Sequence, residues 1–210
     1  VNESMSRFFT PEFLDDNWFG VTIDAGTRPP RVTSVEAESP AAKAGLSVGD
    51  KILRVNGSEN DSFIDLASQL VGVGKDRTIQ FQIERNGKKL DRSVELIPEN
   101  AVFNAGLIRQ KIGAILERLT PEVAEALRLD STDGFVISQV DKDTPAAEAN
   151  LRPGLVVTSI DGRKIDDIID AARIFHSKNK GDEVTLNIVQ MRQRGIFVRR
   201  SSAKLTLRLL

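Results

Sequence analysis

The stretch from Ser39 to Gly57, SPAAKAGLSVGDKILRVNG, has a second copy 105 residues later, where Thr144 to Gly162 is TPAAEANLRPGLVVTSIDG. Seven of the nineteen positions are identical, among them the Pro-Ala-Ala triplet, one Leu and two Gly. The identities fall where backbone geometry is demanding, so chance is a poor explanation for them. A repeat of this length divides the chain into two domains of ordinary size.

Each copy predicts the same local structure. Pro fits the first turn of a short helix, because its missing N–H needs no partner there, and the Ala residues that follow favour helix. Gly45 and Asn150 stand where this helix ends, and both residue types tolerate left-handed backbone. A β-branched run comes next, and then Asn56-Gly57 or Asp161-Gly162, which favours a tight turn. Helix, turn, strand and turn are therefore expected twice.

The parallel continues beyond the repeated stretch. Ser62 to Val71 and Asp167 to His176 carry apolar residues at helical spacing, and strand patterns follow at 78–84 and 183–189. Each copy is therefore expected to have a longer helix after the turn, followed by strands.

An apolar-Gly-apolar motif lies upstream of each copy, where Trp18-Phe19-Gly20-Val21 matches Lys111-Ile112-Gly113-Ala114 at an offset of 93. The twelve residues that account for the smaller offset are Leu119 to Asp130 in the second copy. Thr120 as N-cap and Pro121 at the first helical position predict an additional helix in this segment.

The domain organisation follows from the repeat. We place an N-terminal arm at residues 1–16, a first domain at 17–100 and a second at 101–210, with the boundary at Pro98-Glu99-Asn100. The arm contains Phe8, Phe9, Phe13 and Leu14 and matches no part of the repeat. We expect it to pack on the first domain or on a partner, or to be the end of a further domain.

Composition excludes several classes of function. The net charge of −1 provides no overall field for nucleic acid or an anionic membrane, so neither is expected as a partner. No apolar stretch approaches the roughly 20 residues of a membrane span, and no signal peptide is recognisable. Zero Cys excludes disulfides and thiolate sites. Because the sequence starts at Val1 rather than Met, we expect that a targeting segment or domain precedes it.

No motif of a catalytic, metal-binding or phosphate-binding site is recognisable in the sequence. The single histidine, His176, has no Gly-x-Ser-x-Gly motif to accompany it, whereas a Ser-His-Asp triad needs a base beside an activated serine. The acidic pairs Asp15-Asp16 and Asp166-Asp167 lack metal-site spacing and suit a turn and a helix N-terminus. Val71 to Lys75, VGVGK, follows a helix and is interpreted as a helix stop. We predict no catalytic residues, no metal and no cofactor.

The segment from Gln190 to Lys204 holds four Arg and one Lys and no acidic residue. Binding to an acidic partner or a phosphate backbone, with Phe197 stacked on a base, is one interpretation. A long β-hairpin whose cations prevent edge-to-edge aggregation is the interpretation we favour.

The order of these elements resembles the PDZ family, and more closely the PDZ arrangement of bacterial HtrA-type serine proteases. The stretch from Ser39 to Gly57 carries most of the resemblance, and the additional helix at Leu119 to Asp130 is similar to an HtrA-type insertion. The resemblance implies a mainly β, α+β fold. Two tandem PDZ-like domains are expected, each a small, partly open β-barrel or sandwich with two or three helices.

The resemblance also implies a way of binding. An extended peptide adds a strand to an exposed sheet edge, loop N–H groups capture its terminal carboxylate, and a helix forms the second wall. Apolar walls would favour ligands with an apolar end residue. The implied peptide-binding residues are, in the first domain, Trp18, Phe19, Gly20, Val21, Thr22, Ile23, Phe63, Ala67 and Leu70, and, in the second, Lys111, Ile112, Gly113, Ala114, Ile115, Ile168, Ala172 and Phe175.

Three functions remain open from sequence. The pair of domains is either the substrate-sensing part of an HtrA-like protease whose catalytic domain lies upstream, an adaptor that holds two peptide tails at once, or a structural or oligomerisation module with at least one closed groove. Partners would be peptides or protein C-termini, an upstream protease domain and further copies of the chain. HtrA-like resemblance implies the bacterial cell envelope, either the periplasm or the exterior.

Overall fold

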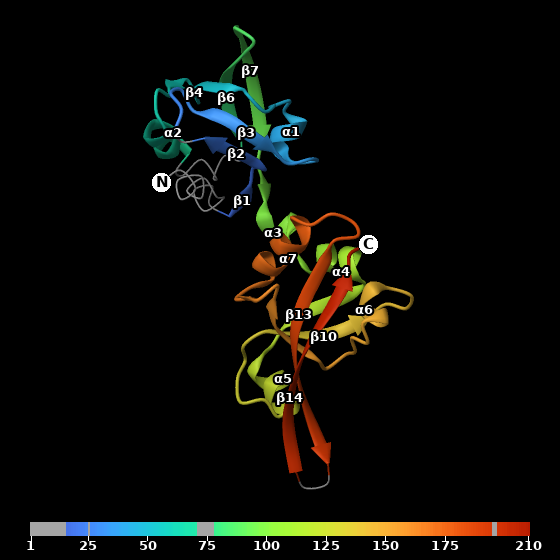
Figure 1. Cartoon of the computed structure of the whole chain (residues 1–210). Helices are drawn as coiled ribbons and strands as arrows, with labels where there is room; N and C mark the ends of the chain where they lie inside the picture. Colours follow the sequence, from blue (N-terminus) through green and yellow to red (C-terminus); the bar gives the residue numbers. More distant parts are fainter. Residues whose placement is uncertain (1–15, 25, 71–77, 195–196) are drawn as a thin grey trace. The chain divides into compact units, whose positions relative to one another are not determined.

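The computed structural model describes residues 16–24, 26–70, 78–194 and 197–210, with side chains for these residues except in 191–200. The chain forms two compact units, Val1–Val102 and Phe103–Leu210 (Figure 1). The expectations for the arm at residues 1–15 and for the helix stop at 71–75 lie outside the described residues.

The first unit is built on one antiparallel sheet with the strand order β2-β3-β4-β6-β7, in which β5 pairs with β4. A separate pair, β1-β8, joins the two ends of the unit. Its elements are β1 (Asn17–Trp18), β2 (Val21–Asp24), β3 (Arg31–Val35), α1 (Pro40–Lys43), β4 (Lys51–Val55), β5 (Ser58–Glu59), α2 (Phe63–Leu70), β6 (Thr78–Arg85), β7 (Lys88–Glu95), β8 (Ile97–Pro98) and α3 (Glu99–Val102).

The second unit has the equivalent strand order β14-β13-β11-β10-β9, in which β12 pairs with β11. Its elements are α4 (Ala105–Ile112), β9 (Ala114–Arg118), α5 (Pro121–Ala126), β10 (Phe135–Val140), α6 (Pro145–Glu148), β11 (Val156–Ile160), β12 (Arg163–Lys164), α7 (Ile168–His176), β13 (Glu183–Arg194) and β14 (Phe197–Arg208). The predicted mainly β fold with helices is confirmed, and both sheets are open rather than closed into barrels.

The backbone repeats at the offset found in the sequence. The amide of Val32 donates to the carbonyl of Asp50, and that of Ile137 to the carbonyl of Leu155. The short helices α1 and α6 both start at the predicted Pro, and Gly45 and Asn150 follow them with φ of +77° and +60°. The positions of the two copies can therefore be compared one by one.

The segments where the copies differ also form as predicted. Thr120 caps the additional helix α5 by accepting a hydrogen bond from the N–H of Val123. The basic segment lies in a long hairpin, in which β13 pairs with β14 from Glu183↔Arg208 to Arg194↔Phe197. This hairpin extends beyond the other strands of its unit (Figure 1).

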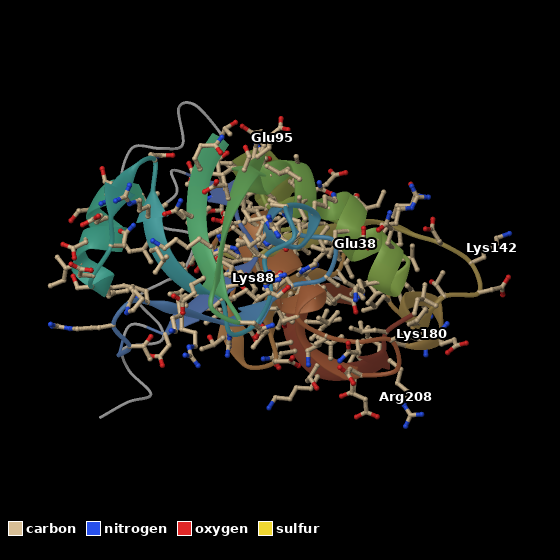
Figure 2. All side chains as sticks on the ribbon, turned by 90° about the horizontal axis from the view of Figure 1, so that it is seen from above. Glu38, Lys88, Glu95, Lys142, Lys180 and Arg208 are labelled. Carbon is tan, nitrogen blue, oxygen red and sulfur yellow. The ribbon has the colours of Figure 1, made fainter. Side chains whose placement is uncertain are left out.

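The core of the first unit lies between its sheet and α2. Phe19, whose ring stacks on Phe81, is buried there together with Ile23, Leu66 and Leu70. Charged side chains such as Lys142 and Arg208 are exposed and point outward from the ribbon (Figure 2). Among the described residues, no helix is long and apolar enough to cross a membrane.

Candidate functional site

Strand β2 is an outer strand of the first sheet, because it pairs with β3 alone among the described strands. Its side chains alternate as expected for a strand with one buried face: Ile23 is fully buried, Val21 is half-buried and Thr22 is exposed. The free side of such a strand presents backbone N–H and C=O groups that an added strand can satisfy. The edge predicted from the sequence is therefore present in the first unit.

The loop before β2 is held from one side. The carbonyl of Gly20 accepts hydrogen bonds from the amide of Glu36 at 2.9 Å and from the hydroxyl of Ser39 at 3.3 Å. Gly20 has a φ of +73°, and a Cβ at this position would overlap the side chain of Ser39. Glycine is therefore required here both for its backbone conformation and for the close approach of Ser39.

Two amide groups of this loop have no acceptor in the part of the chain that the structure describes. The carbonyl of Phe19 accepts from the amide of Ala41 at 3.1 Å. Within the described part of the chain, however, the N–H groups of Phe19 and Gly20 have no acceptor. Two successive N–H groups without acceptors at the start of an open strand are the donors that a carboxylate needs. Trp18, also predicted for this loop, instead lies in β1 opposite Ile97 and is 5% exposed.

The three residues predicted for the apolar wall of the first domain lie on helix α2. Phe63 and Ala67 are half-buried and pack against the core, whereas Leu70 is fully buried. Their i, i+4 and i+7 spacing places all three on one side of the helix. The neighbouring Ile64 is 74% exposed, which leaves an apolar side chain in water beside this wall.

The corresponding loop of the second unit differs from the prediction. Lys111 and Ile112 form the last turn of helix α4 rather than a loop, and Gly113 is its C-cap with a φ of +75°. The amide of Gly113 donates to the carbonyl of Arg109 at 2.7 Å, and the amide of Ile112 lies in the helical hydrogen-bond pattern. The second unit therefore lacks the free loop amides of the first.

The side chain of Lys111 has a hydrogen-bond partner within its own unit. We expected its ammonium group to lie where a carboxylate binds, but Nζ donates to the carbonyl of Lys178 at 2.7 Å. Of the predicted wall, Ile168 is half-buried, whereas Ala172 and Phe175 are fully buried. Ala114 and Ile115 do lie on the outer strand β9 as predicted, with Ala114 buried and Ile115 half-buried.

Sequence reasoning missed helix α4, although its signals are in the sequence. Asn104 caps the helix by accepting hydrogen bonds from the amides of Gly106 and Leu107. Ile108 and Ile112 follow at i and i+4, and both are fully buried. A capping Asn, an apolar pair at helical spacing and a terminal Gly together indicate a helix.

The single histidine of the sequence packs against an aromatic ring. His176 lies at the end of α7 and its ring meets that of Phe103 edge-on, with centroids 5.2 Å apart. No cluster of three metal-binding side chains occurs among the described residues. Two cavities of about 430 and 320 Å³ flank Leu129 beside α5, and both are lined by Leu129, Val156 and Val189.

Comparison with known proteins agrees with this architecture. A model of the PDZ domain matches residues 18–96 and 112–194, which are one segment in each unit. The chain belongs to the PDZ domain family. The PDZ resemblance found from the sequence is thus confirmed.

Curated relatives are named as proteases. A probable periplasmic serine endoprotease DegP-like from Chlamydia pneumoniae is 30% identical over 171 residues, which are 80% of this chain and 33% of that protein. The protein of the same name from Pseudomonas putida strain F1 is 32% identical over 181 residues, 82% of this chain and 37% of that protein. The chain thus spans about a third of the length of these relatives, and they match it through its PDZ domains.

Solved structures of similar proteins include a serine endoprotease from Yersinia pestis. It is 31% identical in sequence, and the match spans 39% of this chain and 28% of the Yersinia chain, with a TM-score of 0.33. The HtrA-type protease AlgW with a decapeptide is 18% identical over 92% of this chain and 59% of its own, with a TM-score of 0.41. The PDZ domain of HtrA3 bound to a phage-derived ligand, FGRWV, is 19% identical over 39% of this chain and 85% of its own, with a TM-score of 0.35.

Proposed function

We propose that the first PDZ domain binds extended peptides by adding them as a strand to β2, with the peptide's C-terminal carboxylate held by the N–H groups of Phe19 and Gly20. The observation that carries this proposal is the pair of unused loop amides at the start of an open edge strand. Main-chain hydrogen bonds along such an edge give affinity, and pockets for alternate side chains give selectivity.

The ligand class follows from the wall of α2. Phe63 and Ala67 are apolar and half-buried, so a peptide side chain that packs against them removes apolar surface from water. A polar end residue would lose its hydration there without gaining a partner. We therefore propose that the first domain favours C-termini that end in an apolar residue.

We further propose that the chain is the regulatory part of an HtrA-like serine protease of the bacterial periplasm. The support is the name shared by the curated relatives, serine endoprotease, together with the two thirds of their length that this chain does not span. The gene sequence upstream of the codon for Val1 tests this proposal. A domain there with a Ser-His-Asp triad is the expected result, and an unrelated domain would contradict it.

Peptide binding is tested with the labelled pentapeptide Phe-Gly-Arg-Trp-Val, the ligand named for the HtrA3 domain. Fluorescence anisotropy with the full chain should show binding of the free acid and a tenfold or greater loss of affinity for the C-terminal amide. The Phe63→Ala variant should weaken binding several-fold, whereas the matched variant Ile168→Ala, at the same position of the second domain, should leave it unchanged. Equal affinity for acid and amide would contradict carboxylate capture.

A further inference from the structure

Helix α4 lies against α7, the helix that carries the predicted groove wall of the second domain. It packs along α7 and continues directly into the outer strand β9. Phe103, just before the helix, is 3% exposed. Its ring contacts His176 edge-on, and the guanidinium of Arg173 lies 5.7 Å from its centroid. Both partners belong to the C-terminal half of α7.

The covering is visible when equivalent positions are compared. Ala172 of α7 is fully buried, whereas its counterpart Ala67 of α2 is half-buried. Ile169 is half-buried, whereas its counterpart Ile64 is 74% exposed. Because both pairs are separated by the same 105 residues, the difference arises from what packs on the helix. In the second domain, α4 packs on α7, and Phe103 contacts Arg173 and His176 of that helix.

The same helix uses the N–H groups of the loop before β9 for its own hydrogen bonds. Gly113 stands at the position of Gly20, yet its N–H donates to Arg109 within the helix end. Ile112 stands at the position of Phe19, and its N–H lies within the helical pattern. A carboxylate that reached this loop would find no free amide pair of the kind seen in the first domain.

Several contacts fix α4 in this position. Arg109 makes a two-bond ion pair with Asp141, with Nε at 2.8 Å and Nη2 at 2.9 Å from the carboxylate oxygens. The carbonyl of Lys111 accepts from the amide of Leu210 at 2.9 Å. The buried side chain of Ile108 fixes the inner face of the helix. Helix α4 is thus held by contacts with Asp141 after β10, with α7, and with Leu210 after β14.

We propose that α4 and Phe103 are an internal occupant that closes the carboxylate end of the second PDZ groove. The second domain does not capture C-terminal peptides while α4 is in place, and peptide capture belongs to the first domain alone. This inference rests on the proposed function for the identity of the groove, but the closure itself is measurable without any ligand.

Amide hydrogen exchange on the full chain tests the closure. The N–H groups of Ile112 and Gly113 should exchange at least tenfold more slowly than those of Phe19 and Gly20. The Arg109→Ala variant should speed exchange at Gly113 several-fold by weakening the attachment of the helix.

The matched control for this variant is Arg54→Ala, which removes an exposed ion pair with Glu59 in the first domain. It should leave exchange at Gly113 unchanged. Exchange at Gly113 as fast as at Gly20 in the wild-type chain would overturn the proposal.

Titration of the ¹⁵N-labelled wild-type chain with Phe-Gly-Arg-Trp-Val gives the second readout. Amide shifts are expected at Gly20 and along β2, and none at Gly113 or β9. Shifts at Gly113 and β9 would overturn the closure. Slow exchange at Gly113 together with no shift in either domain would support the closure and contradict the proposed peptide binding, so the two failures are distinguishable.

Discussion

A buried ion pair in the first domain offers a stringent test of the one-to-one correspondence between the two copies. The carboxylate of Asp50 is fully buried and accepts from Nε and Nη2 of Arg85 at 2.6 and 2.8 Å, and from the amide of Ser47 at 2.9 Å. The equivalent positions of the second domain, 105 residues later, are Leu155 and Gln190. The same turn is therefore built with a charge pair in one copy and without charges in the other.

The Arg85→Ala variant leaves that carboxylate buried with the Ser47 amide as its remaining hydrogen-bond donor. Breaking a buried pair in this way costs about 3–5 kcal/mol. Because the side chain of Arg85 is 31% exposed, so that water can partly replace it, we expect the lower end of that range. The double variant Asp50→Leu, Arg85→Gln copies the second domain. It should lie within about 1 kcal/mol of wild type, because no charge is left buried.

Urea unfolding of the full chain measures both changes. Trp18 is the single tryptophan of the sequence and is 5% exposed in the first domain, so its fluorescence follows that domain alone. The expected order of midpoints is wild type and the double variant close together, with Arg85→Ala well below. A loss under about 1 kcal/mol for Arg85→Ala, or a double variant as unstable as the single one, would refute the reasoning.

Three further predictions concern other parts of the chain. The hydrogen bond from Arg109 lowers the pKa of Asp141 below its usual value, so the stabilisation is complete above the ordinary aspartate pKa of about 4 and is lost as the pH falls through the lowered value. Exchange at the end of α4 should therefore be constant from pH 7 to 5 and quicken only in stronger acid, after correction for intrinsic rates; a change near pH 6 would contradict this. Thr120→Ala removes the cap of α5 and should cost the second domain about 1 kcal/mol in a thermal melt, with peptide affinity unchanged. Gly57→Ala, at positive φ in open space, should cost about 1–2 kcal/mol, and Gly20→Ala should cost more because its Cβ overlaps a neighbour; equal losses would argue against that overlap.

Local sequence signals were sufficient where backbone geometry depends on one or two residues. The Pro that starts α1 and α6, the left-handed Gly45 and Asn150, and the cap of α5 were all predicted from residue type. Such features depend on steric limits and hydrogen bonds within a few residues, which a single sequence displays directly.

Local sequence signals did not predict how deeply the helix beside each predicted groove is buried. Ala67 and Ala172 have the same identity and the same place in the repeat, yet only Ala172 is fully buried. In the second unit, helix α4 packs on α7 from more than fifty residues away in sequence, which no local pattern indicates. Lys111 shows the same limit, because its partner is a backbone carbonyl at Lys178 that no local motif marks.

The most direct test of the account is the structure of the full chain in complex with Phe-Gly-Arg-Trp-Val, determined by crystallography or from intermolecular nuclear Overhauser effects. The peptide should lie as an added strand beside β2, with its terminal carboxylate within hydrogen-bond distance of the Phe19 and Gly20 amides and its last side chain against Phe63 and Ala67. The second domain should be empty, with α4 in place. A peptide bound beside β9, or one whose carboxylate lies away from Gly20, would contradict the account.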